Sequence, residues 1–132
     1  MSMPNISESE WEIMKVIWRN HPITANQITE LLPEDIGWSD QTVRTFINRL
    51  MKKKAIGFER EGRSYNYYPL VSEEECVKSE SNSFLKRVFD GATHLMMTNF
   101  IEHADLSDQE IEQLKKALLE KQDQGQKKRS DE

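Results

Sequence analysis

Residues 39–71 read SDQTVRTFINRLMKKKAIGFEREGRSYNYYPLV, and the spacing of the apolar residues changes in the middle of this stretch. The first half carries one apolar stripe at the three- and four-residue spacing of an amphipathic helix. The residues of this stripe are Val43, Phe46, Ile47 and Leu50. Because Ser39 stands where a helix N-cap is expected, a helix is predicted from there through Lys54.

The second half of the stretch has the pattern of a β-hairpin. Residues 56–60 and 65–71 are short runs rich in aromatic and β-branched residues, which favour strands. Residues 61–64 between them contain Gly62, as hairpin turns commonly do. Tyr65 and Tyr67 recur at the two-residue period of a strand, which favours packing within the hairpin over stacking on bases.

Two further helices are predicted before residue 39. Each begins with a capping box, Ser/Thr-x-x-Glu/Gln, whose two side chains satisfy backbone N–H groups at the helix start. One box is residues 7–10, before a helix that ends at His21-Pro22, and the other is residues 24–27, before a helix that ends near Leu32. The residues expected to face the core are Trp11, Ile13, Met14, Ile17, Trp18, Ile28, Leu31 and Leu32. Three helices followed by a hairpin is the element order of a winged helix-turn-helix.

The rest of the chain is predicted to be helical. Capping boxes recur at residues 72–75 and 107–110, and a break is expected at Asp90-Gly91. The apolar stripes of these helices form a thin core for one chain, so we expect a homodimer that buries them. The alternative is that they pack back on the N-terminal domain of the same chain. The expected dimer contacts are Phe84, Leu85, Val88, Phe89, Leu95, Met96, Phe100, Ile111, Leu114 and Leu118.

The predicted fold class is therefore mainly α with a small β-hairpin, in two domains. Residues 1–71 are expected to form a winged-helix DNA-binding domain and residues 72–121 a helical dimerisation domain. Residues 122–132 are polar and are expected to form a disordered tail.

Charge is distributed unevenly along the chain. The 132 residues carry 18 basic and 23 acidic side chains, a net charge of −5. Residues 1–40 have a net charge of −5, residues 41–71 a net charge of +5, and residues 72–132 a net charge of −5. The positive charge thus lies on the third helix and the hairpin, the elements that a winged helix presents to DNA.

The polar face of the third helix carries residue types that suit DNA contacts. Short Thr and Gln side chains suit base edges, whereas Arg and Lys suit phosphates. The expected contacts on the helix are Ser39, Gln41, Thr42, Arg44, Thr45, Asn48, Arg49 and Lys52. Arg63 and Ser64 at the hairpin tip are expected to reach the DNA backbone.

Several other classes of protein are excluded by the sequence. The single cysteine, Cys76, excludes a disulfide within the chain, and the three histidines lack metal-ligand spacing, so no metal or cofactor is expected. No motif sets a nucleophile beside a base, so the chain is not expected to be an enzyme. The longest stretch without a charged residue is only residues 91–101, and the N-terminus lacks the pattern of a signal peptide. We therefore expect a cytoplasmic protein that is not inserted in a membrane.

The sequence resembles the penicillinase repressor (BlaI/MecI) family over residues 6–119, nearly its whole length. The N-terminal motifs that carry the resemblance are Trp11-Glu12-Ile13-Met14-x-x-Ile17-Trp18, then Trp38-Ser39-x-x-Thr42-Val43-Arg44-Thr45-Phe46-Ile47-x-Arg49-Leu50-x-Lys52-Lys53, and the tyrosine-rich hairpin. The C-terminal motifs are Phe84-Leu85-x-x-Val88-Phe89-x-Gly91, Asn99-Phe100 and Leu106-Ser107-x-x-Glu110-Ile111-x-x-Leu114.

The resemblance implies a homodimeric winged-helix repressor of β-lactamase or penicillin-binding-protein genes. It implies that the dimer binds inverted repeats in double-stranded DNA, with the third helix in the major groove and Tyr65 near the wing contacts. It also implies a partner, a membrane sensor with a metalloprotease domain, that triggers cleavage in the dimerisation region, where Asn99-Phe100 matches the scissile pair. Cutting that helix weakens the dimer, so the two half-sites are no longer held together.

There are three alternatives to this reading, and the first of them is disfavoured. A related branch of copper-responsive repressors has a cysteine-rich metal site, which a chain with Cys76 alone does not match. A winged-helix regulator that senses a small molecule is the second, with the ligand at the dimer interface among Phe84, Phe89, Met96 and Phe100. The third is an adaptor that uses its winged helix for protein contacts, in which Arg44→Ala leaves function intact.

Overall fold

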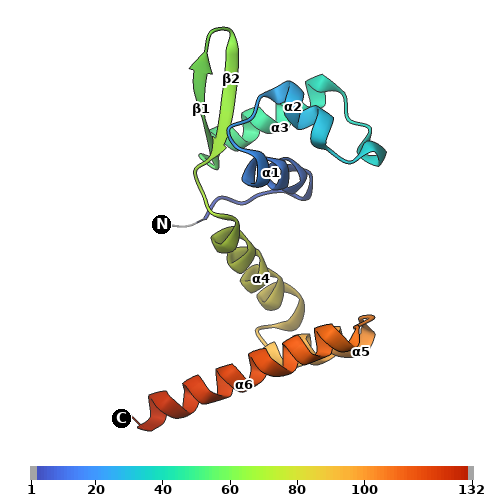
Figure 1. Ribbon diagram of the computed structural model, residues 1–132, viewed down its shortest axis with the longest axis vertical. Coiled ribbons are helices and arrows are strands. Elements are labelled where there is room, and N and C mark those ends of the chain that lie inside the picture. The colour runs from blue at the N-terminus through green and yellow to red at the C-terminus, as the bar shows by residue number, and fades with distance from the viewer. Residues whose placement is uncertain (1–2, 131–132) are drawn as a thin grey trace. The chain divides into compact units, whose positions relative to one another are not determined.

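The computed structural model describes residues 3–130 of the chain as two compact units, one ending at Phe84 and the other beginning at Leu85. The first unit contains α1 (Glu8–Asn20), α2 (Ala25–Leu31), the 3-10 helix η1 (Glu34–Ile36), α3 (Asp40–Lys52), β1 (Ile56–Glu61) and β2 (Ser64–Pro69) (Figure 1). The helix α4 (Glu73–Phe89) crosses the boundary, and α5 (Thr93–His103) and α6 (Asp108–Ser130) belong to the second unit.

The helices begin where the capping boxes predicted. At α1, the Glu10 N–H donates to Ser7 Oγ at 3.2 Å, and the Ser7 N–H donates to Glu10 Oε1 at 2.8 Å. The same reciprocal pair forms between Thr24 and Gln27 before α2, and between Ser107 and Glu110 before α6. Before α4, Ser72 Oγ accepts from the N–H of Glu75. Local side-chain chemistry therefore sets the start of each of these helices.

The core of the first unit is built from one face of each helix and the base of the hairpin. Its fully buried members include Ile13, Met14 and Ile17 of α1, Ile28 of α2, Val43, Ile47 and Leu50 of α3, and Ile56 of β1. Most of the predicted inward residues are therefore confirmed. The prediction was wrong for Leu31, which is 53% exposed, because Ile28 of α2 and the C-cap residue Leu32 take the buried positions at this end of the helix.

Trp11 and Trp18 lie at the edge of this core rather than in its centre. Both are half-buried, and their rings make an edge-to-face contact with centroids 5.4 Å apart. Trp18 Nε1 donates to the backbone carbonyl of Val71 at 2.9 Å. The indole therefore ties α1 to the segment that leaves the hairpin.

The hairpin is antiparallel, with paired residues running from Ile56 opposite Pro69 to Glu61 opposite Ser64. The turn is only Gly62–Arg63, shorter than the predicted residues 61–64, and Gly62 has a φ of 63°. Glu61 and Ser64 belong to the strands because they pair with each other directly. A backbone bridge between Ile23 and Tyr67 fixes β2 beside the segment that leads into α2 (Figure 1).

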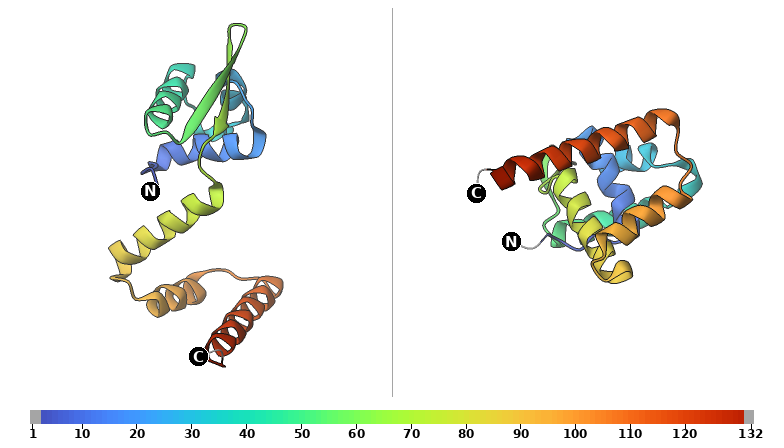
Figure 2. Two further views of the ribbon diagram at one scale, coloured as in Figure 1. Left: turned by 90° about the vertical axis from the view of Figure 1, so that its left-hand side faces the viewer. Right: turned by 90° about the horizontal axis from the view of Figure 1, so that it is seen from below.

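The helices α5 and α6 of the second unit do not pack along each other. The predicted break after α4 is present, with positive φ at Asp90 and Gly91, and both views of Figure 2 show α5 and α6 apart along most of their lengths. The prediction of a disordered tail was wrong for the described residues, because α6 continues through Ser130. Residues 121–130 are rich in Lys and Gln, whose intrinsic propensity favours a helix without the help of core packing. Residues 131–132 lie outside the described part. No helix within residues 3–130 is long and apolar enough to cross a membrane.

Candidate nucleic-acid interface

α3 presents a polar face because its apolar residues are all drawn to the other side. Val43, Ile47 and Leu50 are buried in the core, and Phe46 and Met51 are partly buried against it. Most of the polar residues of α3 are exposed. Ser39 is the N-cap: its Oγ accepts from the Thr42 N–H at 3.2 Å and lies 3.0 Å from the Thr42 hydroxyl. Ser39 therefore holds the start of the helix in addition to lying on its exposed side.

The residues that sequence reasoning assigned to DNA contact lie on the surface. Thr42 is half-buried, and the exposed ones are Ser39, Gln41, Arg44, Thr45, Asn48, Arg49, Lys52, Arg63, Ser64 and Tyr65. Two of them are already oriented by contacts within α3. The Thr45 hydroxyl donates to the Gln41 carbonyl at 2.9 Å, and the Arg49 guanidinium lies 5.6 Å from the centre of the Phe46 ring. These contacts restrict the side-chain rotamers on the exposed face.

One face of the wing, β1–β2 with its turn, carries three aromatic side chains and an arginine. Phe58 pairs with Tyr67, and Arg60 with Tyr65, so these four side chains share one face. The Arg60 guanidinium lies 5.9 Å from the centre of the Tyr65 ring, and its Nε donates to the Gly62 carbonyl at 3.2 Å. Sequence reasoning counted Arg60 in the basic segment but did not name it as a site residue. The register of the hairpin, once known, places it beside Tyr65.

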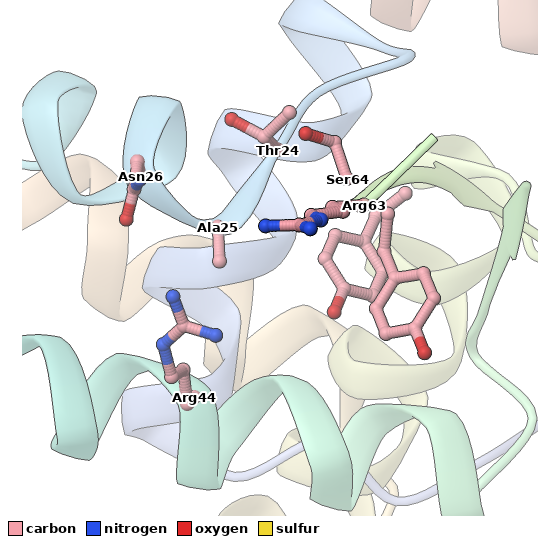
Figure 3. A pocket seen from close by; sticks show the side chains of 8 residues that line it. Thr24, Ala25, Asn26, Arg44, Arg63 and Ser64 are labelled. Carbon is pink, nitrogen blue, oxygen red and sulfur yellow. The ribbon is translucent and has the colours of Figure 1, made fainter. Parts of the chain in front are cut away.

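A solvent-open pocket of about 210 Å³ lies where α2, α3 and the wing meet (Figure 3). Its lining residues are Thr24, Ala25, Asn26, Arg44, Arg63, Ser64, Tyr65 and Tyr67. Burial raises the pKa of the Tyr67 phenol, and the neighbouring Arg44 charge opposes that effect. Sequence reasoning missed Thr24 and Asn26, because only the packing of α2 against α3 brings them beside Arg44.

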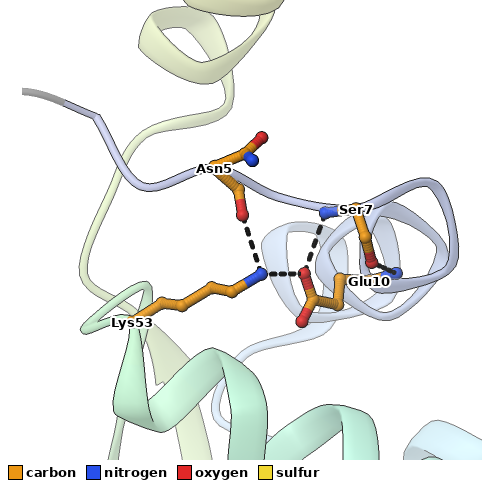
Figure 4. A network of polar contacts seen from close by, with 4 residues as sticks. All are labelled: Asn5, Ser7, Glu10 and Lys53. Atoms are coloured by element: carbon orange, nitrogen blue, oxygen red, sulfur yellow. Dashed lines mark hydrogen bonds and ion pairs between the residues drawn. The ribbon is translucent and has the colours of Figure 1, made fainter.

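Lys53 belongs to the positive segment but is bound to α1. Its Nζ donates to Glu10 Oε1 at 2.5 Å and to the Asn5 carbonyl at 2.7 Å (Figure 4). Glu10 is 1% exposed. Burial raises the pKa of its carboxyl, but the hydrogen bonds from Lys53 and Ser7 lower that pKa by more than burial raises it. The net shift of the Glu10 pKa is therefore downward. Lys53 thus joins the end of α3 to the start of α1.

The predicted dimer contacts, which lie in the second unit except for Phe84, are mostly at the surface. Val88, Leu95, Phe100, Ile111, Leu114 and Leu118 are exposed, and Phe84, Leu85 and Phe89 are half-buried. Met96 differs from the others because it is buried within its own chain. Asn99 and Phe100, the predicted cleavage pair, are exposed in α5, and the Phe100 ring contacts Phe89 edge-to-face at 6.4 Å.

The described residues offer no alternative site for a metal. Within residues 3–130, no three His, Cys, Asp or Glu side chains come together as metal ligands. His21 lies at the end of α1, where its Nδ1 is 3.1 Å from the Ile17 carbonyl. Cys76 is buried in the core of the first unit, and that burial raises the pKa of its thiol.

Comparison with known proteins shows the family to which the chain belongs. The sequence profile described as penicillinase repressor matches residues 6–120. The chain belongs to the penicillinase repressor family. The penicillinase repressor of Bacillus licheniformis is 38% identical to it over 118 residues, which are 89% of this chain and 92% of that protein. The methicillin resistance regulatory protein MecI of Mammaliicoccus sciuri is 38% identical over 116 residues, 88% of this chain and 94% of the relative.

A solved structure of a family member supports the winged-helix fold. The solution structure of the DNA-binding domain of the repressor BlaI is 38% identical to this chain, with a TM-score of 0.51. The match covers 56% of this chain and 90% of that domain. This penicillinase repressor family member is therefore a winged-helix protein, with α3 in the place of the recognition helix and β1–β2 as the wing.

Proposed function

We propose that the chain is a DNA-binding transcriptional repressor that acts as a homodimer on palindromic operators. The observation that carries the proposal is the polar and basic face of α3, which lies beside a wing with Arg60 and Arg63. An exposed helix face of this kind fits the major groove of DNA, and the wing reaches the adjacent backbone. The family supports the same proposal, since it is described as penicillinase repressor. The solved structure of the BlaI relative is that of a DNA-binding domain.

The homodimer is supported by how little of the second unit is buried in a single chain. Among residues 85–127, whose side chains the structure describes, Met96 alone is buried. Apolar side chains in α5 and α6 face solvent, among them Leu95, Ile101 and Leu114. An exposed apolar surface of this extent indicates an interaction site, and a second copy of the chain covers it with twofold symmetry.

The regulated genes are proposed from the relatives. Proteins named penicillinase repressor and methicillin resistance regulatory protein share 38% of residues with this chain over most of its length. We propose β-lactamase or related antibiotic-resistance genes as its targets. We also propose that a membrane sensor-protease inactivates the repressor by cleavage at Asn99-Phe100, which lies in an exposed part of α5.

DNA binding is tested by titrating the full-length chain against palindromic promoter duplexes and a scrambled duplex at two salt concentrations. We expect tighter binding to one palindrome than to the scrambled duplex, with an affinity that falls as salt rises, because phosphate contacts release counterions. We expect Arg44→Ala to weaken the binding markedly and Arg19→Ala, an exposed arginine of α1, to leave it unchanged. Binding that is indifferent to both sequence and salt contradicts the proposal.

Cleavage is tested in cells that produce the chain and are exposed to a β-lactam. Mass spectrometry is expected to detect a fragment that ends at Asn99, and a double Asn99→Ala/Phe100→Ala variant is expected to stay intact and to keep its target genes repressed. Derepression of those genes while the wild-type chain stays whole contradicts cleavage and leaves DNA binding untouched.

A further inference from the structure

The helix α4 connects the two units, and its middle belongs to the core of neither. The first turns of α4 are fixed in the first unit, where Ser72 Oγ accepts the Glu75 N–H and Cys76 is buried in the core. Near the boundary of the units, Phe84 and Leu85 are half-buried. Residues 77–83 between these anchors, the α4 middle segment, are all exposed. Because seven residues make almost two helical turns, the segment packs no side of the helix against a core.

The composition of the α4 middle segment also gives a weak helix. It reads VKSESNS, and more than half of it is serine or asparagine. The short polar side chains of these residues compete with the helix for backbone hydrogen bonds, so both residue types rank well below Ala, Leu and Lys as helix formers. Most of the stability of a helix in a protein comes from packing, which this segment lacks.

The surroundings of the α4 middle segment give it little support. Within residues 3–130, Lys78 and Glu80 form no ion pair. One side of the segment borders a solvent-open hollow of about 370 Å³ rather than a packed interface. The residues that line this hollow are Met3, Glu75, Lys78, Ser79 and Asn82. The free energy needed to open the segment is therefore small compared with that of α1 or α3, which bury one face each.

We infer that the α4 middle segment is a hinge, which opens while both units stay folded and lets one dimer bind operators whose half-sites differ in separation. The inference rests on the proposed homodimer on palindromic DNA. A residue spans about 1.5 Å in a helix and up to about 3.4 Å in an extended chain, so opening the segment lengthens each connection by up to about 13 Å. One inserted base pair moves a half-site by about 3.4 Å and rotates it by about 34°. The opened segment is thus long enough for changes of a few base pairs.

The first experiment measures hydrogen exchange of the full-length chain by mass spectrometry in the absence of DNA. We expect the amides of the α4 middle segment to have protection factors at least about tenfold lower than those of residues 43–50 in α3, because little free energy is needed to open the segment. The triple variant Ser79→Ala/Ser81→Ala/Ser83→Ala puts the strongest helix former at three positions and is expected to raise the protection of the segment about tenfold. The triple variant Ser79→Gly/Ser81→Gly/Ser83→Gly is expected to lower it.

A matched control replaces three exposed polar residues of another helix by Ala and is expected to leave the exchange of the α4 middle segment unchanged. The changes in this control are Gln109→Ala, Gln113→Ala and Gln122→Ala in α6.

The second experiment titrates the same chains against a palindrome that the wild-type chain binds, and against duplexes with one or two base pairs inserted between its half-sites. Binding to the second half-site as a linked event adds about 10²–10⁴ in affinity. We expect the wild-type chain and the α6 control to keep most of this advantage on the longer duplexes. The Ala variant of the α4 middle segment is expected to lose at least about tenfold more of it than the wild type, and the Gly variant is expected to lose less. All four chains are expected to bind a duplex with one half-site equally well.

Two results overturn the inference. Protection of the α4 middle segment equal to that of residues 43–50 means that the segment does not open as a hinge. An Ala variant that gains protection but keeps the wild-type dependence on half-site separation means that the opening does not serve DNA binding. Failure of the proposed function gives a different result, since the wild-type chain then prefers no palindrome over a scrambled duplex, whatever its hydrogen exchange, and the role of the hinge in DNA binding fails with it.

Discussion

Ser39 combines two roles that different substitutions separate. Its Oγ accepts the Thr42 N–H as the N-cap of α3, and its position also puts it among the proposed DNA contacts. Ser39→Ala removes the cap, so we expect urea denaturation to show a free energy of unfolding lower by about 1 kcal/mol. Ser39→Asp keeps a good N-cap but adds a negative charge at the end of α3. We expect this variant to unfold like the wild type and to bind operator DNA several-fold more weakly. Equal operator affinity contradicts a DNA contact at this residue.

Glu10 is expected to make the stability of the first unit depend on pH. Its burial raises the pKa, but the Lys53 and Ser7 hydrogen bonds lower it more, so the folded pKa lies below that of the unfolded chain. A group of this kind stabilises the fold above its unfolded pKa, and the contribution is lost as pH falls through the folded pKa. We therefore expect the free energy of unfolding to fall as pH decreases below about 4.3, the ordinary value for Glu.

The matching variants test whether this pair is the cause. Glu10→Gln cannot titrate, and Lys53→Gln removes the side-chain donor that lowers the pKa most. Urea denaturation at a series of pH values is expected to show a flatter acid limb for both variants. A Glu10→Gln profile parallel to that of the wild type would assign the acid sensitivity to other carboxyls.

At the scale of elements, the wing depends on the conformation of its turn. Gly62 has a φ of 63°, a region that costs a β-branched residue about 1–2 kcal/mol and that Asn tolerates. We expect Gly62→Val to destabilise the hairpin and to weaken operator binding, because Arg63 follows it directly. Gly62→Asn is the control, and urea denaturation together with duplex titration should find it close to the wild type. A Val variant that binds as well as the Asn variant would show that the turn geometry is unimportant for DNA.

The same scale shows what the sequence could predict. Capping boxes and apolar spacing are local signals, so the starts of α1, α2 and α6 were predicted from a few neighbouring residues. The end of α6 was not, because a polar composition determines exposure but does not prevent a helix. The pocket lay beyond local signals altogether, since Thr24 and Arg44 meet only after α2 packs against α3. Arg60 needed the register of the strands, which fixes its face beside Tyr65.

At the scale of the whole molecule, the positive charge and the buried core both lie in the N-terminal part of the chain. The positive net charge is confined to residues 41–71, so the acidic remainder opposes binding to DNA through any other surface. The first unit has a closed core, whereas residues 85–127 bury only Met96 among their described side chains. The second unit buries little within one chain, so a partner that covers its apolar side chains is expected to stabilise it. Under the proposed function, DNA recognition and dimerisation therefore belong to different parts of the chain.

The proposed dimer is tested with two single variants that add the same charge at neighbouring positions of α6. Leu114→Asp puts a carboxylate in the apolar row of α6, and Gln113→Asp puts the same charge on a polar, exposed position next to it. We expect sedimentation to find the Leu114 variant monomeric and the Gln113 variant dimeric. A dimer binds two half-sites as linked events, which raises affinity by about 10²–10⁴ over one half-site. The Leu114 variant is therefore expected to lose its advantage on the full palindrome and to keep the wild-type affinity for a duplex with one half-site. A monomeric wild-type chain, or a Leu114 variant that still prefers the full palindrome, contradicts dimerisation through α6.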